Sequence, residues 1–176
     1  MPKNLEIIKN VIMNDEIEQI KTPYFKFYEL EALCNVGKCH IVLDRMKEYW
    51  GAMLKAGATS FWEEYDLTRP WQEQLGNYNL KYAMSLCHAW GASPIYLLGR
   101  YFLGIKPTST GYETFEVRPN IDAFDTLDAT IPVKGGFVNI KKNNNRVEVL
   151  SDRDGGVLIY KENKYVLQSN KSIVID

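Results

Sequence analysis

The sequence has few of the residues that bind metals or form disulfides, with 3 cysteines and 2 histidines among 176 residues. An odd number of cysteines leaves at least one unpaired, so a reducing compartment is the simplest expectation. Cys39 and His40 lie near Cys34, but a structural zinc site needs four ligands in recognisable pairs and no second pair follows. We therefore predict no metal site and no cofactor.

Excess charge of one sign and long apolar runs are also missing. The 21 basic and 22 acidic residues give a net charge of −1, which argues against nucleic acid and anionic membranes as partners. Charged residues interrupt every apolar stretch well before the roughly 20 residues that a bilayer span requires. Residues 1–6 lack the apolar core of a signal peptide. As written, the chain is predicted to be soluble and cytoplasmic.

The spacing of apolar residues changes near Gly104, and this divides the chain into two predicted parts. Residues 1–105 show helical spacing, whereas residues 106–176 alternate as short strands between turn-forming residues. The spacing predicts helices after Pro23, over 39–55 and over 80–103. It predicts strands around 115–117, 129–133, 137–140, 146–150, 156–160 and 164–167. The second part is therefore expected to be an antiparallel sheet, one layer or more of a sandwich.

The predicted helices carry more apolar surface than they can cover among themselves. The segment 80–103 is apolar on nearly every face, which is typical of a helix inside a larger body. We therefore expect the chain to dock on a partner, to self-associate through uncovered helix faces, or to be the tail of a longer enzyme.

A loop predicted at residues 57–66 combines aromatic rings with carboxylates. Trp62 is followed directly by Glu63 and Glu64, just after the helix that ends at Gly57. Aromatic faces can pack on a sugar ring, and a carboxylate beside them can activate water or protonate a leaving oxygen. The alternative is that the rings belong to the core and the carboxylates to a solvated rim. Glu63 is the stronger catalytic candidate, and the second acid should come from elsewhere.

His88 is the second candidate residue, in the segment 85–90 at a predicted helix start. A single histidine on an apolar helix is more often a hydrogen-bonded core residue than a catalytic one. Cys87 precedes it, but neighbours on a helix point about 100° apart, so the two should not form a nucleophile–base pair. Cys87 and Trp90 are expected to be buried.

Four ordered motifs carry a resemblance to a known family. The motifs are Gly57–Asp66, Ser85–Pro94, Tyr101–Ile105 and Gly111–Pro119. With them the chain resembles the C-terminal portion of bacterial α-L-rhamnosidases of glycoside hydrolase family 78, and residues 21–31 extend the resemblance to nearly the whole chain.

The resemblance implies an α+β chain in which residues 1–105 are the last helices of an (α/α)₆ barrel and residues 106–176 a C-terminal β-sandwich. It also implies inverting hydrolysis of terminal α-L-rhamnosides, with Glu63 as the general base and His88 and Trp62 beside the rhamnose. The family's general acid lies on an earlier part of the barrel, so we predict that this chain alone is inactive. Its predicted partner is a rhamnose-containing glycan or glycoside.

Two alternatives stay open. The chain could be a non-catalytic module that binds sugar or protein around Trp62, Trp71 and Trp90. It could also belong to another (α/α)₆ glycosidase with a different sugar specificity, which would share the barrel but not the four motifs.

Overall fold

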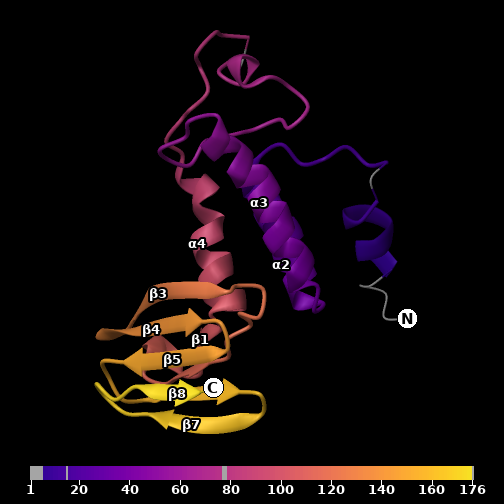
Figure 1. Ribbon diagram of the computed structural model, residues 1–176. Coiled ribbons are helices and arrows are strands. Elements are labelled where there is room, and N and C mark those ends of the chain that lie inside the picture. Colours follow the sequence, from indigo (N-terminus) through magenta and orange to yellow (C-terminus); the bar gives the residue numbers. More distant parts are fainter. Residues whose placement is uncertain (1–5, 15, 77–78, 176) are drawn as a thin grey trace. The chain divides into compact units, whose positions relative to one another are not determined.

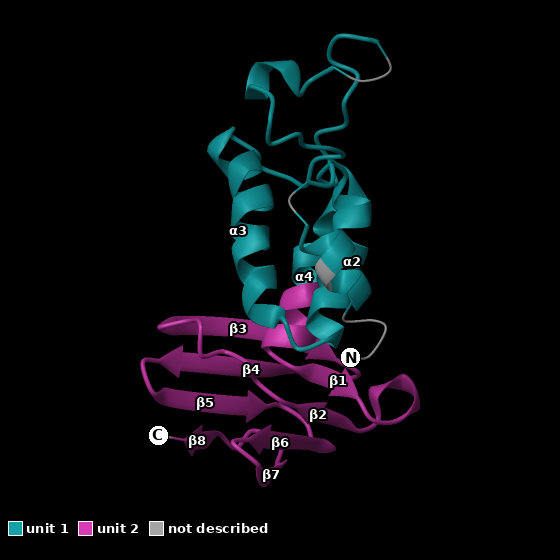
Figure 2. Ribbon diagram, turned by 90° about the vertical axis from the view of Figure 1, so that its right-hand side faces the viewer, with its two compact units in different colours: residues 1–96 teal, residues 97–176 magenta. Residues whose placement is uncertain are grey.

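A computed structural model describes residues 6–14, 16–76 and 79–175. The chain forms two compact units, residues 1–96 and residues 97–176 (Figure 2). We describe each unit by itself. None of the helices among the described residues is long and apolar enough to cross a membrane.

The first unit is helical and has long irregular segments (Figure 1). Its two longest helices, α2 and α3, pack on each other as a hairpin joined by a short turn at Gly37. Short helical turns account for the rest of its regular structure. The elements are η1 (Ile8–Ile12), α2 (Pro23–Asn35), α3 (Cys39–Lys55), η2 (Trp71–Glu73), η3 (Ala89–Ala92) and the start of α4 (Ser93–Leu97).

Both long helices begin and end where the sequence predicts. Thr22 is the extended N-cap residue of α2, and Pro23 fits the first turn because its missing N–H has no partner there. The core between α2 and α3 is built from large apolar side chains, among them Leu30, Leu33 and Tyr49. The hairpin therefore follows from local signals and from one apolar stripe on α3.

The surface of α2 is unusual, because charged residues are buried and aromatic residues are exposed. Lys26 and Glu29 are buried and form an ion pair with 3.0 Å between Nζ and Oε2, which is completed by Arg45. Phe25 and Tyr28, by contrast, are 59% and 50% exposed. The uncovered apolar surface predicted from the sequence is therefore present on this unit.

The prediction of helical structure over residues 80–103 is wrong for its first part. The described residues of 79–88 are irregular, and helical structure begins only at Ala89. Instead of bonding along a helix, the backbone N–H of Met84 donates to Leu75 O at 3.2 Å, and that of Ser85 donates to Glu63 Oε2 at 3.0 Å. Tyr82 has a positive φ of 67°, which a helix does not allow. The backbone of this segment therefore makes long-range hydrogen bonds in place of helical ones.

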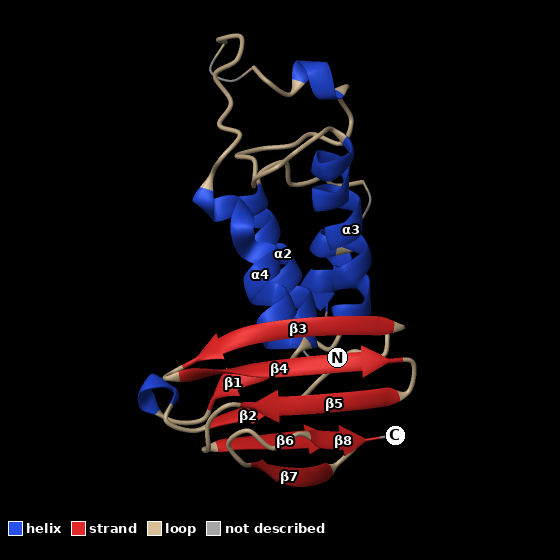
Figure 3. Ribbon diagram, turned by 60° about the vertical axis from the view of Figure 1, so that its left-hand side comes forward, coloured by secondary structure: helices blue, strands red, loops and turns tan. Residues whose placement is uncertain are grey.

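The second unit begins with the end of α4 and η4 (Leu98–Phe102) and continues as two four-stranded sheets (Figure 3). One sheet has the order β1-β2-β6-β7 and the other β3-β4-β5-β8. All pairs are antiparallel except β2 with β6. The strands are β1 (Ile105–Pro107), β2 (Phe115–Val117), β3 (Thr126–Val133), β4 (Gly136–Asn143), β5 (Arg146–Ser151), β6 (Gly156–Tyr160), β7 (Asn163–Leu167) and β8 (Ile173–Ile175), with η5 (Thr110–Tyr112) after β1.

The two sheets share one apolar core, as a β-sandwich does. Inward residues alternate along the strands, for example Val138 and Ile140 on β4 and Val147 and Val149 on β5, all fully buried. The α+β class and the antiparallel sheets predicted from the sequence are therefore confirmed. The barrel remains an expectation that comes from the resemblance.

The helical end of the second unit lies before the boundary predicted at residues 105/106. Leu103 belongs to the core of the sandwich, and the rings of Phe102 and Phe124 meet edge to face with centroids 6.0 Å apart. The compact units accordingly divide at residues 96/97. Packing, rather than the change of spacing near Gly104, decides where the second unit begins.

Candidate functional site

The candidate site lies where the loop after α3 runs beside the segment before η3. Gly57 ends α3 with a φ of +94°, a conformation that glycine adopts without strain. The loop and the later segment are then joined by backbone hydrogen bonds, from Glu63 N to Ser85 O at 3.0 Å and from His88 N to Phe61 O at 2.7 Å. Two segments far apart in the sequence are thus held side by side.

This pairing brings together the two residues that the sequence singles out. Glu63 Oε2 accepts a hydrogen bond from Ser85 N–H at 3.0 Å and lies 3.9 Å from His88 Nδ1. The second distance is too long for a direct hydrogen bond, so the imidazole and the carboxylate attract each other only when His88 is protonated. The Glu63 side chain is 12% exposed and that of His88 31%. A carboxylate so placed is largely shielded from bulk water, and the imidazole beside it is the more exposed of the two groups.

Trp62 and Trp90 differ in what they present to solvent. Trp62 is 5% exposed and packs against Tyr65, with ring centroids 5.9 Å apart, so its ring belongs to the interior of this unit. Trp90 is 42% exposed, and its ring centroid lies 4.1 Å from that of His88. Its indole N–H donates to Glu63 O at 3.1 Å.

The sequence-based expectation that Trp90 is buried is therefore wrong. Because Trp90 lies two residues after His88 at the start of a helix, the same turn that presents the imidazole also presents the indole. The spacing of two residues between His88 and Trp90 was the feature of the sequence that could have indicated an aromatic residue at the site. Cys87 was likewise expected to be buried and is exposed.

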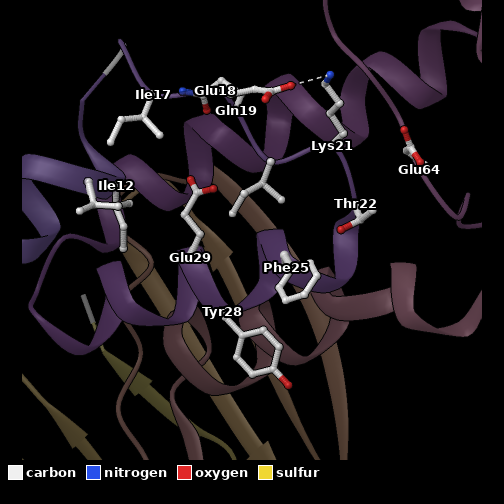
Figure 4. A pocket seen from close by; sticks show the side chains of 12 residues that line it. Ile12, Ile17, Glu18, Gln19, Lys21, Thr22, Phe25, Tyr28, Glu29 and Glu64 are labelled. Atoms are coloured by element: carbon white, nitrogen blue, oxygen red, sulfur yellow. Dashed lines mark ion pairs between the residues drawn. The ribbon is translucent and has the colours of Figure 1, made fainter.

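Glu64 points to a different environment from Glu63, as the sequence predicts for neighbours in a loop. It lines a pocket of about 740 Å³ between α2 and the segment that precedes it (Figure 4). Glu63 does not line this pocket. The carboxylate beside the histidine and the nearby pocket are thus adjacent features rather than one cavity.

A buried polar cluster fixes the end of the loop. Gln74 is 1% exposed, and its side-chain amide bonds both the N–H and the C=O of Asp66, at 2.9 and 2.7 Å. The Asp66 carboxylate accepts from the hydroxyl of Thr68 at 2.6 Å and lies 3.3 Å from Lys21 Nζ. The hydrogen bonds from Thr68, together with Lys21, hold the pKa of the Asp66 carboxyl below its ordinary value despite its burial. Asp66 is thus a structural carboxylate.

The chemistry of the site is that of a carboxylate with an imidazole and an indole beside it. Within residues 6–14, 16–76 and 79–175, no group of three or more His, Cys, Asp or Glu side chains could hold a metal ion. The arrangement can bind a polar ligand against Trp90 and remove a proton from it or from water.

The chain consists of a helical unit followed by a β-sandwich, and its acidic and aromatic loop lies on the helical unit. We compared this fold with solved structures. Its structure is similar to the crystal structure of the GH78 family rhamnosidase of Bacillus sp. GL1, with a TM-score of 0.73 and 23% sequence identity. The match covers 97% of this chain and 19% of that protein, so the chain spans about a fifth of its length. The resemblance carried by the four motifs is thereby confirmed for the fold.

A second solved structure, a candidate kojibiose phosphorylase from the human microbiome, matches 51% of this chain and 13% of its own length, with 13% identity and a TM-score of 0.37. That likeness is too weak to add to the fold assignment. No protein-family model and no curated protein matches the sequence.

Proposed function

We propose that this chain is part of an inverting α-L-rhamnosidase and carries the general base of that enzyme, Glu63. One observation supports the proposal above all: Glu63 Oε2 and His88 Nδ1, from two distant motifs, lie 3.9 Å apart in a chain whose fold is similar to that of the GH78 rhamnosidase. A core-and-rim arrangement would not require the carboxylate, the imidazole and an exposed indole to converge.

In this proposal the roles follow from the geometry. Ser85 N–H holds Glu63 Oε2, which leaves Oε1 to take a proton from a water molecule as that water attacks the anomeric carbon. His88 donates to a sugar hydroxyl, and the exposed face of Trp90 packs on the sugar ring. Trp62, buried against Tyr65, would act mainly by holding the loop that carries Glu63.

The proton for the departing oxygen must come from an acid outside this chain. An inverting pair stands roughly 6.5–9.5 Å apart to admit the water, and a neighbouring residue such as Glu64 points elsewhere. The purified chain is therefore expected to bind L-rhamnose without hydrolysing an aryl rhamnoside.

A chimaera gives the decisive test. This chain would replace the matching fifth of the Bacillus sp. GL1 rhamnosidase, and release of nitrophenol from 4-nitrophenyl α-L-rhamnoside would be measured. Glu63→Gln should lower kcat by about 10²–10⁴-fold, because water activation is lost while the shape is kept. Glu64→Gln is the matched control and should stay within about tenfold of the parent.

Binding to the chain alone tests the sugar. Titration with L-rhamnose should shift the NMR signal of the Trp90 indole N–H, which lies in the site, and His88→Ala should weaken the affinity. D-mannose and D-galactose are the comparison sugars. Equal kcat for the two glutamine variants, or no preference for L-rhamnose, would refute the assignment.

A further inference from the structure

Gly91 lies unusually close to the loop that carries Glu63. It belongs to η3 and is buried, and its backbone lacks the positive φ that favours glycine. A Cβ atom at this position would lie 2.8 Å from Phe61 Cβ and 2.9 Å from Trp62 O, whereas such atoms are in ordinary contact at 3.4–4 Å. Space, rather than backbone conformation, therefore requires glycine here.

Trp50 connects Gly91 to α3. The Trp50 indole N–H donates to Gly91 O at 2.9 Å, and the side chain is 7% exposed. Its ring meets that of Tyr49 edge to face, with centroids 4.9 Å apart, and both residues are buried in α3. A ring packed in this way has few alternative positions. The position of η3 is therefore set from α3.

The two segments of the candidate site are drawn together by hydrogen bonds and kept apart by the Gly91 contact. The backbone N–H of Glu63 donates to Ser85 O at 3.0 Å. A second bond runs from His88 N to Phe61 O at 2.7 Å. The Gly91 backbone limits how closely the segments can approach, because it already touches the loop. Attraction and contact together fix the spacing.

Gly91→Ala would widen that spacing. Phe61 Cβ would have to move at least about 0.6 Å away to reach an ordinary contact of 3.4 Å. A displacement of this size would stretch the bond from Glu63 N–H to Ser85 O beyond its normal length. Catalytic groups must be held within about 0.5 Å, and a misplacement of about 1 Å can cost about 10²-fold in rate. The glycine therefore acts on Glu63 through the backbone.

We propose that Gly91 and Trp50 are positioning residues for the proposed general base, because together they set the distance between the Glu63 carboxylate and the His88 imidazole. This inference rests on the proposed function, which supplies the role of Glu63. Gly91 and Trp50 are both buried, so they act through the backbone of residues 61–63 rather than by contact with a ligand.

Amide hydrogen exchange of the intact chain, read residue by residue by NMR, tests the packing. Gly91→Ala should speed the exchange of the Glu63 and His88 amides at least about tenfold and leave the amides in the middle of α3 within about twofold. Trp50→Phe removes the bond to Gly91 O but keeps a ring, so it should have the same effect at smaller size, and it serves if Gly91→Ala does not fold. Gly51→Ala is the matched control, because a Cβ there would lie in open space.

Turnover in the chimaera described above tests the catalytic consequence. Per folded molecule, Gly91→Ala should lower kcat by about 10- to 10²-fold and leave KM within about threefold, because the groups that contact the sugar are retained. A residue that only stabilised the fold would lower the folded fraction measured by circular dichroism, but not kcat per folded molecule. Gly51→Ala should match the parent.

The outcomes separate this inference from the proposed function. A folded Gly91→Ala protein with unchanged exchange at Glu63 and His88 would overturn the positioning role. Equal kcat per folded molecule would overturn it as well, while Glu63→Gln still decides the rhamnosidase assignment. A parent chimaera that releases no nitrophenol would overturn the proposed function and with it the catalytic role of this spacing.

Discussion

Replacement of Gln74 should destabilise the helical unit far more than its position just after the short surface helix η2 indicates. Its side chain makes three hydrogen bonds to the backbone, with Asp66 N–H at 2.9 Å, Asp66 O at 2.7 Å and Arg69 O at 2.9 Å. Gln74 is 1% exposed, so water does not replace these bonds unless the loop opens. Gln74→Ala would therefore remove the bonds described for Asp66 N–H and Arg69 O, while Asp66 O would keep only the bond from Arg69 N–H at 3.1 Å.

The size of the effect follows from the number of bonds lost. At about 1 kcal/mol net for each, three hydrogen bonds amount to about 3 kcal/mol. For a unit of about 100 residues, 1 kcal/mol corresponds to about 4–8 °C in Tm, so a decrease of at least about 12 °C is expected. Gln74→Glu should be no better than alanine, because it keeps the volume but loses both N–H donors that face carbonyl oxygens.

Urea and thermal unfolding, followed by circular dichroism, measure this loss. Gln72→Ala is the matched control in the same short helix, since Gln72 is exposed, and should change Tm by less than about 2 °C. Hydrogen exchange adds a local measurement, because the Asp66 amide should lose its protection in Gln74→Ala. A Gln74→Ala protein as stable as Gln72→Ala, with the Asp66 amide still protected, would refute the reasoning.

Three further predictions follow from the described contacts. The hydrogen bonds from Thr68 lower the pKa of the Asp66 carboxyl in the folded chain. The ionised carboxylate therefore stabilises the fold above its ordinary pKa, and this stabilisation is lost as the pH falls below about 4. Asp66→Asn should flatten that part of the stability–pH profile measured by urea unfolding. Gly104→Ala should destabilise the sandwich by several °C more in Tm than Gly135→Ala, since both have positive φ but only the first would place a Cβ 1.8 Å from Arg118 O. With Phe25 and other large apolar side chains exposed, the chain should self-associate at high concentration, which sedimentation velocity would contradict by showing a monomer throughout.

Local chemistry explains what the sequence predicts well. Pro23 starts α2, Gly57 ends α3, and the alternation after Gly104 forms strands, because each signal acts within a few residues along the chain. The six predicted strands are present, whereas β1 and β8, of three residues each, were not predicted. They form because a neighbouring strand offers hydrogen bonds, β2 to β1 and β5 to β8.

The errors share one cause, which is that contacts distant in the sequence override local preference. Residues 80–88 are apolar enough for a helix, yet Ser85 bonds to Glu63 and the chain is irregular there. Trp90 was assigned to the core by its residue type, but its ring is exposed and its indole N–H donates to Glu63 O. In both cases the partner lies more than twenty positions away, beyond the reach of any periodicity.

The sequence by itself therefore determined which segments form helices and which form strands in most of the chain, and where the helices give way to sheets. It also determined the two motifs that carry the candidate residues Glu63 and His88. Only the tertiary structure decided that the two meet at 3.9 Å, that Trp62 is inside and Trp90 outside, and that a pocket opens beside Glu64. Helix and strand propensities depend on neighbours along the chain, whereas a site depends on backbone bonds between distant segments, such as His88 to Phe61, which a one-dimensional pattern does not contain.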